Sequence, residues 1–261
     1  MSNLADIVVF GTGHFAARIV LDLAATADEE ISIVVAGRNA ARAAWIRTAA
    51  AARASMFGRS VRVVERILPA LDITNVASLL AELKPKVVAN TASAQGGRVA
   101  VTRPDRWTSF VEEGGLTVTA IFQARISLAV AQAVSEVTPK SYFVNCCYPD
   151  VVNGMIAGAG LPIACGIGNV AILAHAFAGA LGPGHGRLQV LAQHKALMPF
   201  RNAPSTRTGR YAPRVWLEGH EIRDVHSHFS AVQLAPEPVI DISGASGVPL
   251  FLAMAAALPA A

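Results

Sequence analysis

The feature that most constrains the fold is a short apolar run that ends in a glycine-rich turn and continues as a helix. Ile7–Phe10 is apolar and β-rich, and Gly11, Gly13 and Ala16 follow it in the pattern G-x-G-x-x-A. Apolar residues then repeat at helical spacing over 15–23. The first glycine permits a tight turn, the second leaves room beside the backbone, and the small third residue lets helix and strand pack closely. This strand, turn and helix predict the first unit of an α/β fold.

The same alternation continues through the first half of the chain. Apolar runs typical of buried strands are separated by helical patterns; the strands lie at 31–35, 61–64, 87–89 and 142–144, and the helices at 40–55, 76–83 and 123–137. Strands that are apolar throughout and separated by helices are typical of a parallel sheet covered on both faces. With right-handed crossovers, the fold class predicted is α/β, a Rossmann-type doubly wound parallel sheet. Residues 116–122 suit either a strand or a helix.

The character of the sequence changes after Asn145. Glycine-rich loops, an apolar helix over 170–181 and short alternating runs replace the regular strand and helix pattern. Such a mixture predicts a smaller α+β part. We therefore expect two domains, one over 1–148 and one over 149–261.

The glycine-rich turn is typical of a dinucleotide site. Backbone N–H groups at the start of a helix bind phosphates, and the second glycine lets a pyrophosphate approach the backbone. The predicted contacts in this turn are Gly11, Thr12, Gly13, His14, Phe15 and Ala16.

The end of the second strand predicts which dinucleotide binds. Units that bind NAD usually place Asp or Glu there, to accept a hydrogen bond from the ribose 2′-hydroxyl. This chain has Gly37, Arg38 and Asn39 at that point and Arg42 one helical turn later, with no acid. A guanidinium attracts the 2′-phosphate of NADPH, whereas a carboxylate repels it. We predict NADPH/NADP+ as the cofactor; the alternative, that Arg38 is only a solvated residue at a helix start, stays open.

Composition excludes several other classes of protein. The chain is 53% hydrophobic and 15% charged, which excludes a disordered chain or a coiled coil. Its longest stretch without Asp, Glu, Lys or Arg, 151–186, is interrupted by prolines and glycines, so we expect no membrane partner. The N-terminus has an acid where a secretory signal carries cations, and Cys146, Cys147 and Cys165 form no disulfide framework. A cytoplasmic location is therefore expected.

The distribution of charge points to an anionic partner. Between Asp150 and Glu218 there is no acid, while Arg187, Lys195, Arg201, Arg207, Arg210 and Arg214 all fall there. No interleaved aromatic pattern or zinc-finger spacing indicates nucleic acid, so we expect a small anionic substrate. The histidines at 220, 226 and 228 have no established ligand spacing, and no metal is expected.

Segments of the second half resemble the lactate and malate dehydrogenases. Val144–Asp150 resembles a strand that ends in that family's N-P-V-D type motif, and Leu191–Ala196 resembles the strand that carries its catalytic histidine. Residues 243–247 resemble a helix start near the substrate. The resemblance, which spans almost the whole chain in the expected order, implies that His194 donates and accepts the proton. It also implies that Asn145 orients the reacting oxygen and the nicotinamide carboxamide.

The same resemblance implies further contacts. The loop after the fourth strand would bring Thr91, Ala92 and Ser93 to the cofactor and Arg98 to the substrate carbonyl, as a catalytic residue. Ser246 would lie near the substrate. His175 stands where the family keeps its substrate-binding arginine, and is the matching substrate residue here.

Two departures leave the chemistry open. Ile172 stands where the family pairs its histidine with an aspartate, and the chain ends soon after a helix of 247–257, where the family continues. We predict an NADPH-dependent reductase or dehydrogenase that transfers hydride to a C=O or C=N bond of a small, 2-oxo acid-like anion. The alternatives are an imine reductase of the opine or saccharopine type, and a non-catalytic NADPH-binding sensor or partner subunit. The apolar excess favours a homodimer.

Overall fold

The chain packs into two compact units. The computed structural model describes residues 5–95, 105–207, 211–234 and 245–258. The first unit comprises Met1–Gly166 and Val248–Ala261, and the second comprises Ile167–Gly247. This division differs from the predicted boundary at 148, because residues 149–166 and the C-terminal helix pack with the first unit.

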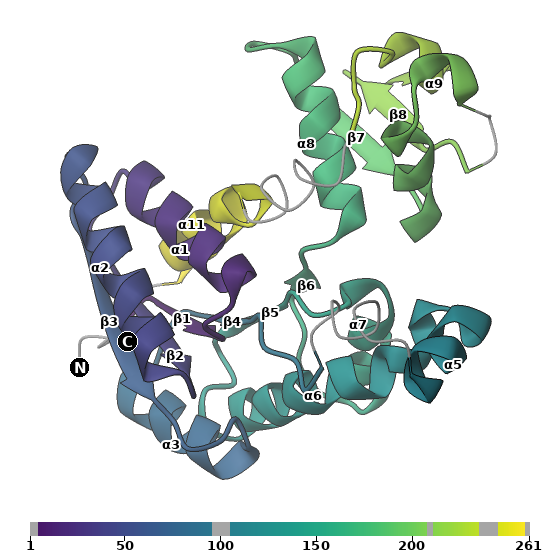
Figure 1. The fold of residues 1–261 in the computed structure, drawn as a ribbon. Coiled ribbons are helices and arrows are strands. Elements are labelled where there is room, and N and C mark those ends of the chain that lie inside the picture. The colour runs from purple at the N-terminus through teal and green to yellow at the C-terminus, as the bar shows by residue number, and fades with distance from the viewer. Residues whose placement is uncertain (1–4, 96–104, 208–210, 235–244, 259–261) are drawn as a thin grey trace. The chain divides into compact units, whose positions relative to one another are not determined.

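The first unit is built on a six-stranded sheet in the order β3-β2-β1-β4-β5-β6 (Figure 1). The strands are β1 (Ile7–Phe10), β2 (Ile31–Gly37), β3 (Val61–Ile67), β4 (Val87–Asn90), β5 (Tyr142–Asn145) and β6 (Cys165–Gly166). Every neighbouring pair is parallel. The winding reverses between β1 and β4, so the predicted doubly wound sheet is confirmed.

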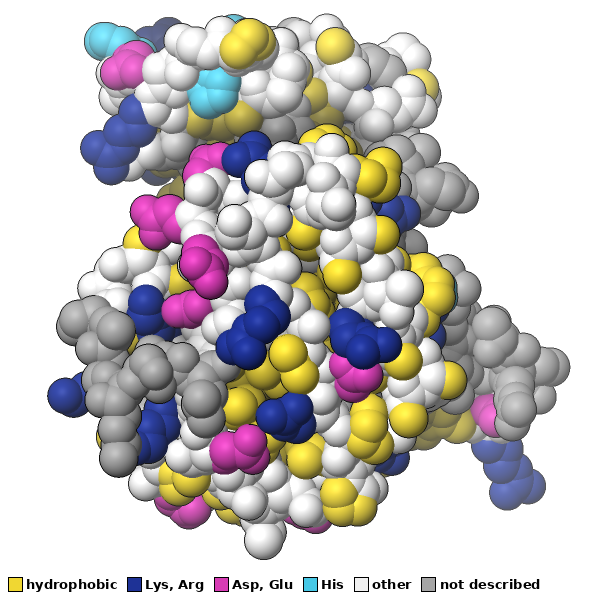
Figure 2. Space-filling view, turned by 90° about the vertical axis from the view of Figure 1, so that its left-hand side faces the viewer, with side chains coloured by type: hydrophobic (Ala, Val, Ile, Leu, Met, Phe, Trp, Pro, Cys, Tyr) yellow, Lys and Arg dark blue, Asp and Glu magenta, His cyan; other side chains and the backbone are white. Residues whose placement is uncertain are grey.

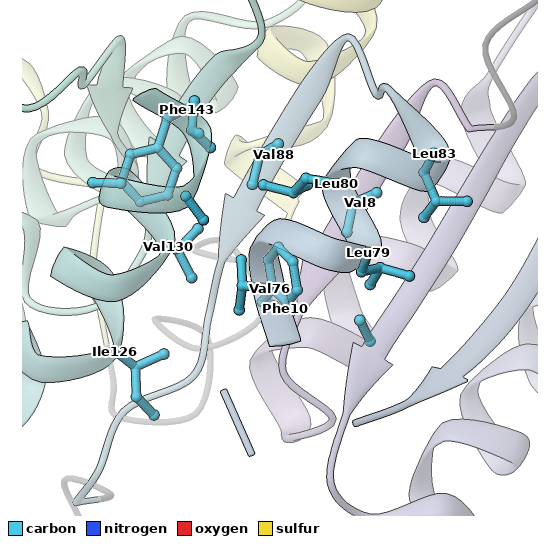
Figure 3. Close-up of a cluster of buried hydrophobic side chains, with 14 of the residues drawn as sticks. Val8, Phe10, Val76, Leu79, Leu80, Leu83, Val88, Ile126, Val130 and Phe143 are labelled. Carbon is cyan, nitrogen blue, oxygen red and sulfur yellow. The ribbon is translucent and has the colours of Figure 1, made fainter. Parts of the chain in front are cut away.

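Helices cover both faces of this sheet (Figure 1). On one face lie α1 (His14–Thr26), α2 (Ala40–Met56) and α11 (Val248–Ala257), and on the other α3 (Ile73–Leu83), α6 (Ala120–Val137) and α7 (Pro149–Gly158). Successive side chains of a strand point to opposite faces. Val8 and Phe10 therefore share the face where Leu80 of α3 and Val130 of α6 complete a buried core (Figure 3).

The segment that suited either a strand or a helix is helical. A 3-10 turn, Leu116–Thr119, follows α5 (Arg106–Gly114) and leads into α6. The span Thr117–Val137 is long and apolar enough to cross a membrane by length and composition alone. Half of it is buried inside the fold, where Val130 and Val134 of α6 belong to the core of the first unit.

The second unit has the predicted α+β character. Its elements are α8 (Asn169–Leu181), an antiparallel sheet of β7 (Leu188–Leu191), β8 (Arg214–Leu217) and β9 (His220–Ile222), the 3-10 helices η2 (His194–Arg201) and η3 (Pro204–Thr206), and α9 (Val225–His228). Three phenylalanines form its centre: the ring of Phe177 stacks on Phe229, with centroids 4.0 Å apart, and meets the edge of Phe200 at 5.1 Å. This unit therefore has a hydrophobic core of its own.

Candidate functional site

The glycine-rich turn lies at the carboxyl ends of β1 and β4, where the strand order reverses. In open α/β sheets this crevice is the place where ligands bind. Gly11 holds φ at +123°, and its N–H donates to the carbonyl of Ala36 at 2.8 Å. A Cβ on Gly11 would lie 2.2 Å from the Thr91 hydroxyl oxygen, which itself donates to the carbonyl of Phe10 at 2.8 Å. Only glycine fits at this first position.

The second glycine leaves the start of α1 open. Gly13 is the N-cap of α1 in an extended conformation, no side chain caps the helix, and its first turn holds no acid. A Cβ built on Gly13 would have no atom within 4 Å, so open space lies beside it. The first backbone N–H groups of a helix lack partners within the helix and carry partial positive charge. This helix start therefore offers a fitting cradle for a phosphate.

A cavity of about 690 Å³ opens at this turn. Nine predicted cofactor residues line it: Gly11, Thr12, Gly13, Gly37, Arg38, Asn39, Thr91, Ala92 and Ser93. Three more of the described residues line it and were not predicted, Ala40, Leu71 and Ile126. Leu71 follows β3, and its place could have been predicted from the sequence, because the carboxyl ends of parallel strands share one edge of the sheet. Ile126 comes from the middle of α6, and no local pattern marks it.

Four other residues of the predicted cofactor set, besides Asn145, do not line this cavity. His14 and Phe15 begin α1, and Ala16 is fully buried, where its small side chain lets helix and strand pack closely. Arg42 is committed to the protein: its Nε donates to the carbonyl of Thr12 at 3.4 Å, and its guanidinium lies 4.2 Å from the ring centre of Trp45. Arg42 therefore braces the turn.

Arg38 has the opposite character, because it is exposed and lines the cavity at the end of β2. It has no hydrogen bond or ion pair with any other residue among those the structure describes. Its neighbour Asn39 caps α2 by accepting from the backbone N–H of Arg42 at 3.0 Å.

On the face that Figure 2 shows, Lys and Arg side chains lie among acidic and hydrophobic ones and are not gathered into one patch.

Asn145, predicted to orient the substrate and the nicotinamide, lies in a buried polar network. Its Nδ2 donates to the carbonyl of Cys147 at 3.0 Å and to Oδ1 of Asn153 at 2.9 Å. Its Oδ1 accepts from the Ser127 hydroxyl at 2.9 Å and from the N–H of Cys147 at 3.0 Å. The carboxamide is fully buried and all its hydrogen-bonding positions are used, so none remains for a substrate oxygen.

The same network supports the loop after β4, part of which lines the cavity. Asn90 pairs in register with Asn145 on the neighbouring strand and donates to the Ser127 hydroxyl at 2.9 Å. Asn90 also closes a local turn, in which it accepts from the N–H of Ala92 at 3.1 Å and donates to the carbonyl of that residue at 3.1 Å. Because Ala92 lines the cavity, this buried network holds the loop after β4 in place.

The other predicted catalytic and substrate residues are distributed over the chain. Arg98 lies outside the described residues. His194 belongs to the second unit; it is exposed and begins the 3-10 helix η2, where a strand position was predicted, because β7 ends at Leu191. Its ring lies within 3.1 Å of the Asn169 carboxamide nitrogen at the start of α8. His175 is exposed on α8, and Ser246 is half-buried just before α11.

The cysteines have raised pKa values. Burial raises the pKa of Cys147 to about 12, and burial together with the neighbouring thiols raises that of Cys146 well above its ordinary value. The Cys147 thiol donates to the carbonyl of Ala92 at 3.2 Å. Thiols with raised pKa are poor nucleophiles, so the surroundings of Cys146 and Cys147 do not favour a nucleophilic role. The described residues contain no group of three or more His, Cys, Asp or Glu placed to hold a metal ion.

No protein-family model matches this sequence, and neither does any curated protein sequence. Solved structures do match. A lactate dehydrogenase of Cryptosporidium parvum, complexed with lactic acid and nicotinamide adenine dinucleotide, is 18% identical over 98% of this chain and 75% of its own, with a TM-score of 0.50. The malate dehydrogenase of the same organism is 16% identical over 96% of this chain and 74% of its own, with a TM-score of 0.51.

A malate dehydrogenase of Archaeoglobus fulgidus in complex with NADH is 15% identical over 91% of this chain and 74% of its own, with a TM-score of 0.52. The matches extend over both compact units of the chain. At these identities they describe architecture and not activity. This chain has the fold of the lactate and malate dehydrogenases.

Proposed function

We propose that this protein binds NADPH at the crevice beside Gly13 and reduces a C=O or C=N bond of a small anionic molecule. The observation that carries the proposal is the open helix start of α1, which faces a 690 Å³ cavity at the reversal point of the sheet. A pyrophosphate is the group whose size and charge such a helix start accepts. Solved structures of this fold hold NAD or NADH, which agrees with a nicotinamide cofactor.

The preference for NADPH over NADH rests on this chain's own residues. The end of β2 carries Gly37, Arg38 and Asn39, and no acid stands there to accept from a ribose 2′-hydroxyl. The exposed guanidinium of Arg38 lines the cavity and is free to pair with a phosphate. A guanidinium binds phosphate oxygens through two parallel hydrogen bonds, so Arg38 favours the 2′-phosphorylated form.

The chemistry then requires a proton as well as a hydride. When bound, the nicotinamide ring supplies the hydride to the substrate carbon, and a proton must join the carbonyl oxygen or imine nitrogen. We propose His194 as the proton donor, because its imidazole can donate and accept a proton through its ring nitrogens, and the Asn169 carboxamide nitrogen lies 3.1 Å from the ring. The cation-rich stretch that contains Lys195 and Arg201 supports an anionic substrate.

Titration with NADPH and NADH tests the proposal directly. We expect wild-type protein to bind NADPH more tightly, and Arg38→Ala to weaken NADPH binding about tenfold with little change for NADH. Arg47→Ala is the matched control, since Arg47 lies on α2, pairs with Glu65 at 3.2 Å and does not line the cavity. A wild-type protein that binds neither NADPH nor NADH would contradict the proposal.

Activity assays separate the two reductions. NADPH absorbance is followed with a panel of 2-oxo acids alone, and then with the same acids plus primary amines. Turnover without amine indicates carbonyl reduction, and turnover that needs the amine indicates imine reduction. Tight NADPH binding without turnover in either panel contradicts catalysis and favours a cofactor-binding sensor.

A further inference from the structure

A second cavity, of about 680 Å³, adjoins the first. The two share three lining residues, Arg38 at the end of β2, Leu71 after β3 and Ile126 on α6. All three belong to the first compact unit, and Ile126 is labelled in Figure 3 at the margin of the core cluster. A ligand that starts at Gly13 and passes Arg38 therefore enters this second cavity.

Arg125 brings a second cation to this cavity. Buried neighbours in α6, among them Ile126 and Val130, fix the rotation of the helix. Arg125 and Ala129 are one helical turn apart and both line the cavity, so this face of α6 forms one of its walls. No sequence motif around Arg125 identifies it as a binding residue. The fold brings it to the cavity that Arg38 also lines.

The guanidiniums of Arg38 and Arg125 both line this cavity. Neither Arg38 nor Arg125 forms an ion pair or hydrogen bond with another residue in the described ranges. Among the described residues that line the cavity, Asp72 is the only acid. Its carboxylate caps α3, accepting from the backbone N–H and the side-chain amide of Asn75 at 2.9 Å each. Two like charges that line one cavity favour an anion between them.

Part of the cavity wall is apolar. Leu71, Ile126 and Ala129 offer a surface on which the flat face of a purine can pack. A ligand with a purine and a phosphate close together satisfies both parts of the wall. Adenosine with a phosphate on its ribose has that chemistry.

We propose that Arg125 is a specificity-determining residue, which binds the 2′-phosphate of NADPH together with Arg38. This inference rests on the proposed function, because it assumes that the pyrophosphate lies at Gly13. It adds a second cation from a different element, so that the phosphate is held from α6 as well as from the end of β2. Discrimination between NADPH and NADH then depends on both arginines.

The test measures binding of four ligands by calorimetry to the full chain: NADPH, NADH, adenosine 2′,5′-bisphosphate and adenosine 5′-monophosphate. The variants are Arg125→Ala, Arg125→Gln, Arg38→Ala and the double alanine variant. Arg66→Ala is the matched control, because Arg66 is a surface arginine that pairs with Glu82 at 3.4 Å and lines neither cavity. Thermal unfolding of each variant verifies that it is folded, and Arg125→Gln preserves most of the side-chain length if Arg125→Ala is unstable.

We expect both Arg125 variants to weaken NADPH and the bisphosphate about tenfold, with less than about twofold change for NADH and the monophosphate. Equal weakening of phosphorylated and unphosphorylated ligands, or no weakening at all, overturns the role of Arg125. In that event tight NADPH binding by the wild type leaves the proposed function intact. A wild-type protein that binds neither dinucleotide overturns the proposed function first, and this inference with it.

Discussion

Replacing Gly13 with alanine separates an effect on the proposed phosphate site from an effect on the stability of the fold. Gly13 has φ of −77° and ψ of −177°, a conformation that alanine adopts without strain. The new methyl would meet no protein atom within 4 Å, since it would project into open space beside the turn. The loss of a favourable N-cap residue, about 0.5–1 kcal/mol, is offset by a similar gain from the less flexible unfolded chain. The free energy of unfolding is therefore expected to change by less than about 1 kcal/mol.

Gly11→Ala is the companion variant with the opposite expectation. At φ of +123° a Cβ is strained by about 1–3 kcal/mol. The same Cβ would also lie 2.2 Å from the Thr91 hydroxyl oxygen and 3.2 Å from the Ala92 nitrogen, an overlap that adds roughly 1–3 kcal/mol. The sum, about 2–6 kcal/mol, is a large fraction of the stability of a typical domain and lowers Tm by roughly 5–20 °C.

Thermal unfolding and NADPH titration of the two variants form the assay. Gly13→Ala is expected to keep Tm within about 3 °C of wild type and to lose at least about tenfold in NADPH affinity, because the methyl occupies the space that a pyrophosphate needs. Gly11→Ala is expected to lose stability whether or not nucleotide is present. Undiminished NADPH binding by Gly13→Ala would refute the placement of the pyrophosphate at this turn.

Three further predictions concern the remaining groups. His194→Ala is expected to retain NADPH binding and to lose roughly 10²–10⁴-fold in turnover with the best substrate of the panel, and full turnover would remove it as proton donor. Asn145→Ala leaves buried partners unpaired and is expected to lower the free energy of unfolding by about 1–3 kcal/mol, measured by urea denaturation; an unchanged midpoint would contradict the network. Burial raises the pKa of Cys147 from 9.0 to about 12, so the thiol loses its proton at a lower pH in the unfolded chain than in the folded protein. The contribution of this thiol to the free energy of unfolding is therefore complete below pH 9. Above pH 9 the free energy of unfolding falls by up to about 1.4 kcal/mol per pH unit, and Cys147→Ala is expected to reduce that slope.

Much of the proposed nucleotide site followed from local patterns. The strand before Gly11 and the helix after it are set by hydrophobic periodicity, and the turn between them by glycine chemistry. Arg38 was predicted from its place at the end of the second strand, and Thr91 from the resemblance to the dehydrogenase family. The turn and Arg38 depend only on neighbours close in the sequence and on the general rules of a doubly wound sheet.

Other parts of the site depended on contacts between distant segments. Asn145 carries the residue type expected of an orienting group, but Ser127, Cys147 and Asn153 occupy its carboxamide. Whether a polar side chain faces a ligand or another side chain is decided by what packs against it. No pattern around residue 145 contains that information.

The sequence by itself determined the class of fold, the glycine-rich turn and the cation at the end of the second strand, because strand period, helix period and turn conformation are local properties of the chain. Only the tertiary structure decided that Ile126 and Arg125 of α6 line the cavities beside that turn, and that Asn145 is sealed in a buried network. These outcomes depend on the rotation of a helix against a sheet. That rotation is set by the packing of side chains far apart in sequence, such as Phe10, Leu80 and Val130.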